Sequence, residues 1–210
     1  MNWGVPLMLV AMLMPAVAEP STSRELRFKV LLDDREVGSH RFQIIEQDGH
    51  RQVQSDFRVT VKFLFIDAYN YVHQARERWR GDCLEAIESR TDADGERRAV
   101  QGRRGGDRLR VVASDAQVDG PSCVMSFAYW NPAILEQSRL LNAETGEIKA
   151  VRVEALGQET VMVRGASVVA KRYALHARDL RIDVWYAAGD QWVQLESRTE
   201  GDRVLTYRIR

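Results

Sequence analysis

Apolar side chains occupy alternate positions over much of the chain. Between residues 53 and 65 they are Val53, Phe57, Val59, Val61, Phe63 and Phe65. The same alternation is found at Leu26, Phe28, Val30 and Leu32, at Ile182, Val184 and Tyr186, and at Leu205, Tyr207 and Ile209. A period of two places successive side chains on opposite faces of a half-buried β-strand. Strands are therefore predicted near both ends of the folded chain.

Short polar segments with Asp, Glu and Gly separate these stretches. They lie at 33–34, 47–49, 92–95, 105–106, 144–146 and 200–202, and this composition is typical of turns between neighbouring strands. One helix is predicted near 132–139, because Asn131 can cap it and Pro132 suits its first turn. About ten to twelve short strands with one short helix predict an all-β fold, either an antiparallel barrel, a half-barrel or a strongly curved sheet.

Two eleven-residue stretches, 81–91 and 189–199, are alike, with six of eleven positions identical. A Trp precedes each Gly-Asp pair, at Trp79 and Trp185, and a turn containing Gly follows each stretch. Each copy is predicted to form the first turn and second strand of a three-stranded meander. The similarity has two explanations, a duplicated meander or convergent hairpin sequences.

The first 18 residues contain no charged side chain and four of the six Met residues. An apolar run followed by Ala16-Val17-Ala18 predicts a secretory signal peptide over 1–18. Cleavage there would leave one β-rich domain over 19–210. No later apolar stretch approaches the ~20 residues of a membrane-spanning helix. The protein is therefore predicted to be periplasmic or secreted, with no integral span in the mature chain.

The chain has 210 residues, with 30 basic and 30 acidic side chains and a formal net charge of zero. This length suits one ordinary domain. A neutral protein lacks the positive field that attracts nucleic acid, so no nucleic-acid partner is expected. The low counts of Gly and Pro, 14 and 5, exclude collagen-like and disordered chains.

The chain has two cysteines, Cys83 and Cys123. In an oxidising compartment an even pair is most simply a disulfide. Closing a loop of about 40 residues would contribute about 3–4 kcal/mol by the chain-entropy argument. The alternative is two buried free thiols.

Several blocks can be compared with known families. They are 38–42, 68–71, 77–79, 123–132, 140–142 and 145–147, with Phe-Ala-Tyr-Trp-Asn-Pro at 127–132 the most specific. Together they resemble an uncharacterised secreted family of Gram-negative bacteria, domain of unknown function 6134. The segment 185–210 is similar, more loosely, to the periplasmic family of domain of unknown function 3108. Neither family has an established activity, so the resemblance implies no catalytic or binding residue.

The sequence contains no short catalytic, phosphate-binding or dinucleotide-binding motif. The four histidines, His40, His50, His73 and His176, do not have metal-ligand spacing. No catalytic residue, metal ligand or cofactor is therefore predicted. A triad could still assemble from distant residues such as His73, Asp67 and Ser126, which leaves a hydrolase with a non-local active site as one alternative.

Asp67, Tyr69, Tyr71 and His73 share one face of a predicted strand that leads to Trp79. This pattern has two explanations. The four residues form an aromatic stripe of the core, or they form the wall of a cavity in which hydroxyls and an imidazole orient a mostly apolar ligand.

The block at 127–132 places Tyr129 and Trp130 beside the predicted helix. The helix is either a plug that completes the core or a lid that closes over a ligand. As part of a lid, Trp130 is expected at the rim.

Six arginines lie within a 14-residue window, at Arg97, Arg98, Arg103, Arg104, Arg108 and Arg110. A solvated hairpin explains them, since alternate strand positions are exposed and acidic residues lie just upstream. The alternative is a docking patch for phosphate-like anions.

These observations favour a non-enzymatic envelope protein that binds an apolar or lipid-like molecule in a β-barrel cavity. The candidate ligand-binding residues are Tyr69, Tyr71, His73, Trp79, Tyr129 and Trp130. The alternative is a structural or protein-interaction module with a filled core, whose partner would be another envelope protein.

Overall fold

The computed structural model describes residues 21–63, 66–114, 116–199 and 201–210, without the side chains of residues 62–68. The predicted signal peptide lies outside the described residues. The strands are β1 (Thr22–Leu32), β2 (Arg35–Gln47), β3 (His50–Phe63), β4 (Ile66–Arg80), β5 (Cys83–Ala93), β6 (Glu96–Gly105), β7 (Arg108–Ala113), β8 (Ala116–Pro121), β9 (Met125–Ser126), β10 (Arg139–Leu141), β11 (Ile148–Ala150), β12 (Arg152–Val163), β13 (Ala166–Ala177), β14 (Leu180–Ala187), β15 (Gln191–Arg198) and β16 (Val204–Ile209). The two 3-10 helices are η1 (Pro132–Glu136) and η2 (Ala188–Asp190).

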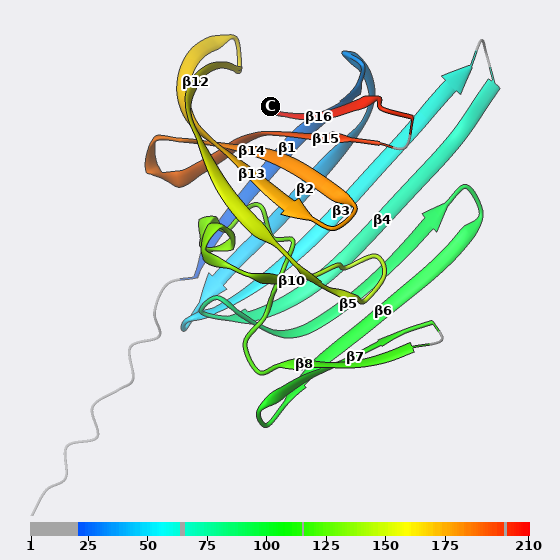
Figure 1. The fold of residues 1–210 in the computed structure, drawn as a ribbon, viewed down its shortest axis with the longest axis vertical. Coiled ribbons are helices and arrows are strands. Elements are labelled where there is room, and N and C mark those ends of the chain that lie inside the picture. The colour runs from blue at the N-terminus through cyan, green and yellow to red at the C-terminus, as the bar shows by residue number, and fades with distance from the viewer. Residues whose placement is uncertain (1–20, 64–65, 115, 200) are drawn as a thin grey trace, which may run out of the picture.

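Thirteen strands form one antiparallel sheet in the order β12-β13-β14-β15-β16-β1-β2-β3-β4-β5-β6-β7-β8, and β9, β10 and β11 form a small second sheet. β1 and β16 pair in the middle of the large sheet, with Val30 opposite Tyr207. The sheet curls so that β10 lies between β12 and β8 in the view of Figure 1. The predicted all-β fold is confirmed, although the described strands exceed the ten to twelve expected.

Alternation along the strands gives the sheet two faces. On β1, Phe28 and Val30 are fully buried, whereas Arg27 and Lys29 are exposed. Burying a large apolar side chain contributes about 1.5–3 kcal/mol, so the apolar face turns inward. We call the face that carries Phe28 the inner face and the opposite face the outer face.

Residues 122–151 leave the large sheet after β8 and return to it as β12, and we call this segment the plug. Its side chains Met125, Ile134 and Leu140 are at most 1% exposed and belong to the same apolar core as the inner face of the sheet. This burial supports the plug interpretation over the lid. Because the plug is mostly irregular, it shows no sustained period of two that would reveal its burial in the sequence.

The predicted helix is present but shorter than expected, and it is a 3-10 helix. Asn131 caps it as predicted, since its side-chain oxygen accepts a hydrogen bond from the Ala133 amide at 3.1 Å. The helix ends at Glu136 because Gln137 is extended. β10 then begins at Arg139. None of the helices in the described parts of the chain has the length and apolar character needed to cross a membrane.

The predicted disulfide is confirmed. Cys83 at the start of β5 is bonded to Cys123 in the plug, with their Cα atoms 4.7 Å apart. The adjacent Leu84 amide donates to the Val124 carbonyl at 3.1 Å. The plug is therefore attached to the sheet both covalently and by its backbone.

The two similar stretches both lie in three-stranded meanders, β4-β5-β6 and β14-β15-β16. In the first meander the register shifts so that Glu85 is an extra residue on β5. In the second, Val193 is the extra residue on β15. These are the fifth positions of the two stretches. The shared β-bulge supports a duplicated meander, because bulges are specific backbone features.

Candidate functional site

The inner side chains of β4 meet the plug and the neighbouring strands on the inner face of the curved sheet. Tyr71 donates its hydroxyl hydrogen to Glu144 of the plug at 2.9 Å. His73 Nδ1 lies 2.8 Å from the Thr91 hydroxyl on β5. Both Tyr71 and His73 are half-buried. Two of the predicted ligand-binding residues therefore lie on the inner face beside the plug.

His40 on β2 extends this surface. Its Nε2 lies 2.7 Å from the Ser55 hydroxyl, and its ring centroid lies 5.0 Å from that of Phe57 and 5.5 Å from that of Tyr207. Its other ring nitrogen, Nδ1, is a fully buried polar atom that has no partner among the described residues. Burial lowers the pKa of His40 to about 3, so the imidazole is neutral.

Glu77 lies on the same face of β4 as His73. Its carboxylate accepts a hydrogen bond from Trp79 Nε1 at 3.1 Å and another from the Ser126 hydroxyl of the plug. Burial raises the pKa of Glu77 to about 7, because its two hydrogen-bond donors are neutral and offset only part of the desolvation. Sequence analysis missed this residue, although its position between His73 and Trp79 in the alternating stripe was a signal.

Tyr129 of the plug and Tyr207 of β16 complete this region. Burial raises the pKa of both phenols. Neither hydroxyl has a hydrogen-bond partner among the described residues, and neither is one of the fully buried unpaired atoms. Each hydroxyl therefore faces space that a water molecule can enter. We call this region the inner wall; its residues are His40, Phe57, Tyr71, His73, Glu77, Ser126, Tyr129 and Tyr207.

Several residues of the inner wall combine accessible surface with strong desolvation. Glu77, Tyr71 and His73 are half-buried rather than fully buried, yet burial is the largest cause of the pKa shift of each one. A group on the outside of a protein would not be desolvated to this extent. These three side chains therefore keep accessible surface on the inner face although protein atoms surround them closely.

The remaining predicted ligand-binding residues have different positions. Trp79 is fully buried and packs edge-on against Trp130, with ring centroids 5.4 Å apart. Trp130 is only 3% exposed and has the guanidinium of Arg51 5.4 Å from its ring centroid, so the expected rim position is wrong. Tyr69 is 40% exposed and stacks near Tyr71, with centroids 6.5 Å apart. Trp79 and Trp130 therefore act chiefly as core residues.

The structure does not assemble the proposed triad in its described contacts. His73 pairs with Thr91 and Ser126 pairs with Glu77, while the side chain of Asp67 lies outside the described residues. Across the described residues, no group of three or more His, Cys, Asp or Glu side chains has the geometry to hold a metal ion.

Most of the six clustered arginines have acidic partners. Arg97 pairs with Asp92, Arg98 with Glu96 and Glu144, and Arg104 with Glu85, and both Arg108 and Arg110 lie near Asp119. Arg103 has no ion pair within the described parts of the chain. Acidic residues also line the groove of about 600 Å³ beside Arg103, Arg104, Arg108 and Arg110. These contacts support the solvated-hairpin explanation.

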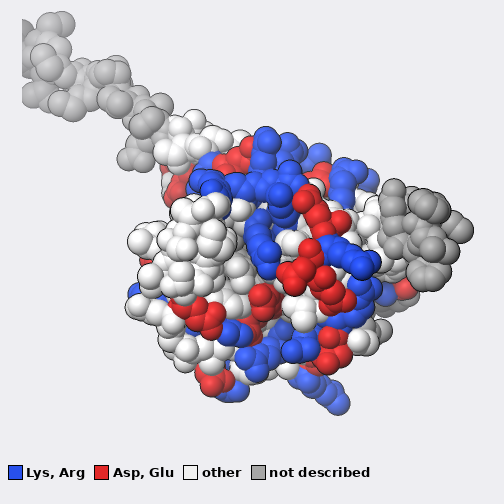
Figure 2. All heavy atoms as spheres, turned by 90° about the horizontal axis from the view of Figure 1, so that it is seen from above, with Lys and Arg blue, Asp and Glu red and all other residues white. Residues whose placement is uncertain are grey.

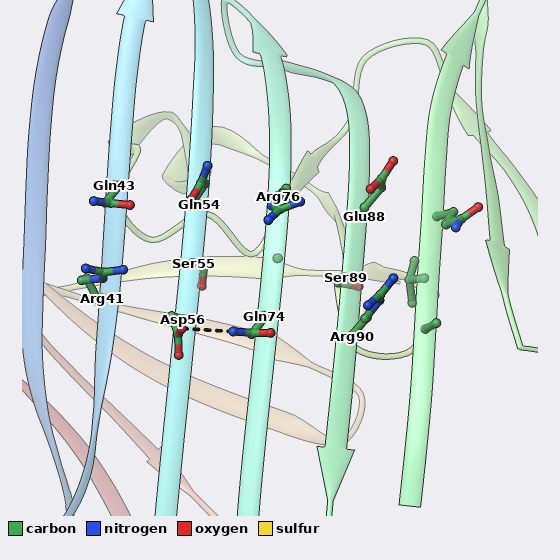
Figure 3. Close-up of a pocket in the computed structure, with 14 residues that line it drawn as sticks. Arg41, Gln43, Gln54, Ser55, Asp56, Gln74, Arg76, Glu88, Ser89 and Arg90 are labelled. Carbon is green, nitrogen blue, oxygen red and sulfur yellow. Dashed lines mark hydrogen bonds between the residues drawn. The ribbon is translucent and has the colours of Figure 1, made fainter.

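A smaller hollow of about 230 Å³ lies on the outer face across β2 to β6 (Figure 3). Its labelled side chains come from neighbouring strands, and Gln74 donates to Asp56 at 3.1 Å. Arginines, carboxylates and amides line it together, and Figure 2 shows basic and acidic side chains lying next to one another over part of another face of the molecule. This mixture is typical of a solvated outer face, so the inner wall is the stronger candidate site.

Comparison with known proteins shows the fold and the family. A beta-barrel-like protein of domain of unknown function 1849 from Brucella abortus is similar in structure, with a TM-score of 0.62 and 11% identity over 92% of this chain and 98% of that chain. Identity at this level shows the fold alone. No curated protein matches the chain. The model of domain of unknown function 6134 matches residues 28–210, so the chain belongs to that family, as the block at 127–132 predicts.

Proposed function

We propose that this protein is a periplasmic or secreted binding protein that holds a small, mostly apolar, lipid-like molecule in a recess that we place in front of the inner wall. The recess residues are rings with polar tips, such as Tyr71, Tyr129 and Tyr207. Sites for small apolar molecules combine such rings with a few polar groups that orient the ligand.

One observation carries this proposal. His40 Nδ1 of the inner wall is a fully buried polar atom without a partner among the described residues, and the hydroxyls of Tyr129 and Tyr207 have no hydrogen-bond partner there but reach accessible space. Leaving a buried polar group unpaired costs about 1–3 kcal/mol. A filled and purely structural core would avoid this cost, whereas a ligand or ordered water would satisfy these atoms.

The proposed compartment is supported by the disulfide between Cys83 and Cys123, since disulfides persist in oxidising compartments. The absence of catalysis is part of the proposal, and the triad of His73, Asp67 and Ser126 gains no support from the described contacts, in which His73 pairs with Thr91.

A second function has its own support. The plug buries Met125, Ile134 and Leu140 almost completely against the sheet, which is what an interaction module with a filled core would need. In that account the recess would hold only water, and the outer face would contact another envelope protein.

Fluorescence titration with N-phenyl-1-naphthylamine, a neutral apolar probe, distinguishes these functions. We expect saturable binding of one probe per protein and displacement by decanol. Phe57→Ala should weaken probe binding about tenfold, because a ring of the inner wall is lost. Arg58→Ala, which changes the next residue on the exposed outer face of β3, is the matched control and should bind as the wild type does.

An absence of saturable binding in the wild type would contradict the ligand-binding function and favour the interaction module. Equal loss of binding in the Phe57→Ala and Arg58→Ala variants would place the probe elsewhere. Organic extraction of protein purified from its own periplasm, followed by mass spectrometry, then identifies any natural ligand.

A further inference from the structure

Glu77 differs from the other buried carboxylates of this protein in its partners. The side chain of Asp183 is 7% exposed and pairs with Arg172 and Arg181. The side chain of Glu85 is 13% exposed and is surrounded by three arginines, Arg78, Arg80 and Arg104. In both places guanidinium groups compensate the buried negative charge.

No charged group compensates Glu77 within the part of the chain that the structure describes. Its partners are the Trp79 indole and the Ser126 hydroxyl, and both are neutral donors. Removing a carboxylate from water is costly unless a cation or several hydrogen bonds replace the lost hydration. The carboxyl group of Glu77 is therefore either protonated and neutral, or ionised and in need of a cation that the described chain does not supply.

The position of Glu77 allows that partner to come from outside the chain. The residue keeps accessible surface on the inner face, at the border between β4 and the plug. An aromatic residue lies at this border, because the Trp79 indole donates to the Glu77 carboxylate at 3.1 Å. Rings near a carboxylate favour cations, since the faces of aromatic rings attract positive charge.

We propose that Glu77 receives the positively charged nitrogen of the ligand, and that the ligand class is an apolar molecule with one amine or quaternary ammonium group. This inference rests on the proposed function, because it places the ligand in the same recess. Trp79 and Ser126 would then position the carboxylate, while the rings of Phe57, Tyr129 and Tyr207 contact the apolar part.

Three ten-carbon probes that differ only in their head group test this inference. Decylamine, decanol and decanoate are titrated separately at pH 7.5, below their aggregation concentrations, with displacement of N-phenyl-1-naphthylamine as the signal. We expect the wild type to bind decylamine at least tenfold more tightly than decanol, and decanoate more weakly than either.

Two variants assign the preference to Glu77. Glu77→Gln keeps the size of the side chain and should lose the preference, so that decylamine no longer binds more tightly than decanol. The matched control is Glu88→Gln, which changes an exposed carboxylate on β5 and should keep the full preference. Near-ultraviolet circular dichroism verifies that each variant is folded, and the wild-type comparison needs no variant.

The outcomes separate this inference from the proposed function. Equal binding of decylamine and decanol by the wild type overturns the inference and leaves the proposed function intact. A preference that survives in Glu77→Gln also overturns it, because another group would then hold the nitrogen. Failure of all three probes to bind saturably overturns the proposed function and the inference with it.

Discussion

The meanders β4-β5-β6 and β14-β15-β16 have similar backbones and different chemistry. Both place a β-bulge at the fifth residue of the repeated stretch, at Glu85 and Val193. In both, the indole of a tryptophan before the turn donates to a carboxylate at 3.1 Å, from Trp79 to Glu77 and from Trp185 to Glu159. The two tryptophans, however, lie on opposite faces of the sheet.

Trp79 lies on the inner face, against Trp130 of the plug. Trp185 lies on the outer face, opposite in direction to the inner neighbour Tyr186, whose hydroxyl donates to the carbonyl of Tyr129. The guanidinium of Arg172 lies over the Trp185 ring, 4.8 Å from its centroid. The two tryptophans occupy neighbouring rather than equivalent positions of the repeat, since Trp79 pairs with Leu84 before the bulge and Trp185 pairs with Gln194 after it. One therefore lies in the interior and the other under a layer of charged groups.

The carboxylates that accept from the two indoles, Glu159 and Glu77, differ in their charged neighbours and in their pKa. Arg172 donates to Glu159 at 2.6 Å and holds the pKa of that carboxyl below its ordinary value. Glu77 has no such cation among its described neighbours, and burial raises its pKa. The comparison teaches that the second site is complete within the chain, whereas the first lacks a positive charge.

The largest effects are expected from the two tryptophans. Trp79→Ala and Trp185→Ala should each lower the free energy of unfolding by about 3–5 kcal/mol, because both side chains are at most 2% exposed. Only Trp79→Ala should also weaken decylamine binding, since it removes a hydrogen bond to Glu77. Urea unfolding and probe displacement measure the two effects. Loss of decylamine binding in both variants would contradict the claim that only Trp79 supports the binding site.

The disulfide comes next, because the first meander has it and the second has Gln191 at the position that corresponds to Cys83. Replacing Cys83 and Cys123 together by Ala should lower the free energy of unfolding by about 3–4 kcal/mol through loss of the loop constraint. Urea unfolding of the double variant, compared with reduced wild type, measures this. A change below about 1 kcal/mol would show that the hydrogen-bonded plug stays in place without the bond.

The sequence could predict much of this backbone but little of the site. Alternation gives β1 and β16, the repeated stretch gives both meanders, and Asn131-Pro132 gives the start of η1. These are local signals, because each depends on residues adjacent in the chain. The alternation also placed Trp185 on the opposite face from Val184, so its outward position was available from the sequence.

The site depends on contacts between distant segments. Ser126 meets Glu77 from 49 positions away in the sequence, and only the plug brings them together. Trp130 was expected at a rim because it precedes a helix, but the irregular plug carries it into the core. Whether a carboxylate has an arginine beside it follows from strand order and register, which no short pattern contains.

Neutralising one carboxylate in each meander, Asp183 or Glu77, should change the free energy of unfolding differently. Asp183→Asn leaves Arg172 and Arg181 with less compensation and should lower the free energy of unfolding by about 2 kcal/mol at pH 7.5. Glu77→Gln should leave it unchanged or raise it, because an uncompensated charge is removed. Urea unfolding tests both, and a larger loss in Glu77→Gln than in Asp183→Asn would reverse the comparison.

A further effect is expected in the pH dependence of stability. The folded pKa of Glu77, about 7, exceeds its ordinary value of 4.5, so its contribution is full below about pH 4.5 and is lost as the pH rises through 7. His40 acts oppositely, since its folded pKa of about 3 lies below 6.5 and its contribution is lost as the pH falls through 3.

Comparison with Glu77→Gln cancels the contribution of His40. From pH 4.5 to pH 8 the wild type should lose about 3 kcal/mol of stability relative to this variant. Urea unfolding at several pH values gives both curves. Parallel curves over that range would mean that the carboxyl group ionises equally in the folded and unfolded chain.

The most direct measurement is a carbon-13 NMR titration of glutamate carboxyl groups, with the Glu77 signal assigned from its absence in Glu77→Gln. We predict a midpoint near 7 for Glu77 and one below 4.5 for Glu159. Adding decylamine should lower the Glu77 midpoint and leave that of Glu159 unchanged. A Glu77 midpoint near 4.5 that does not move with decylamine would contradict the claim that this carboxylate lacks a cationic partner.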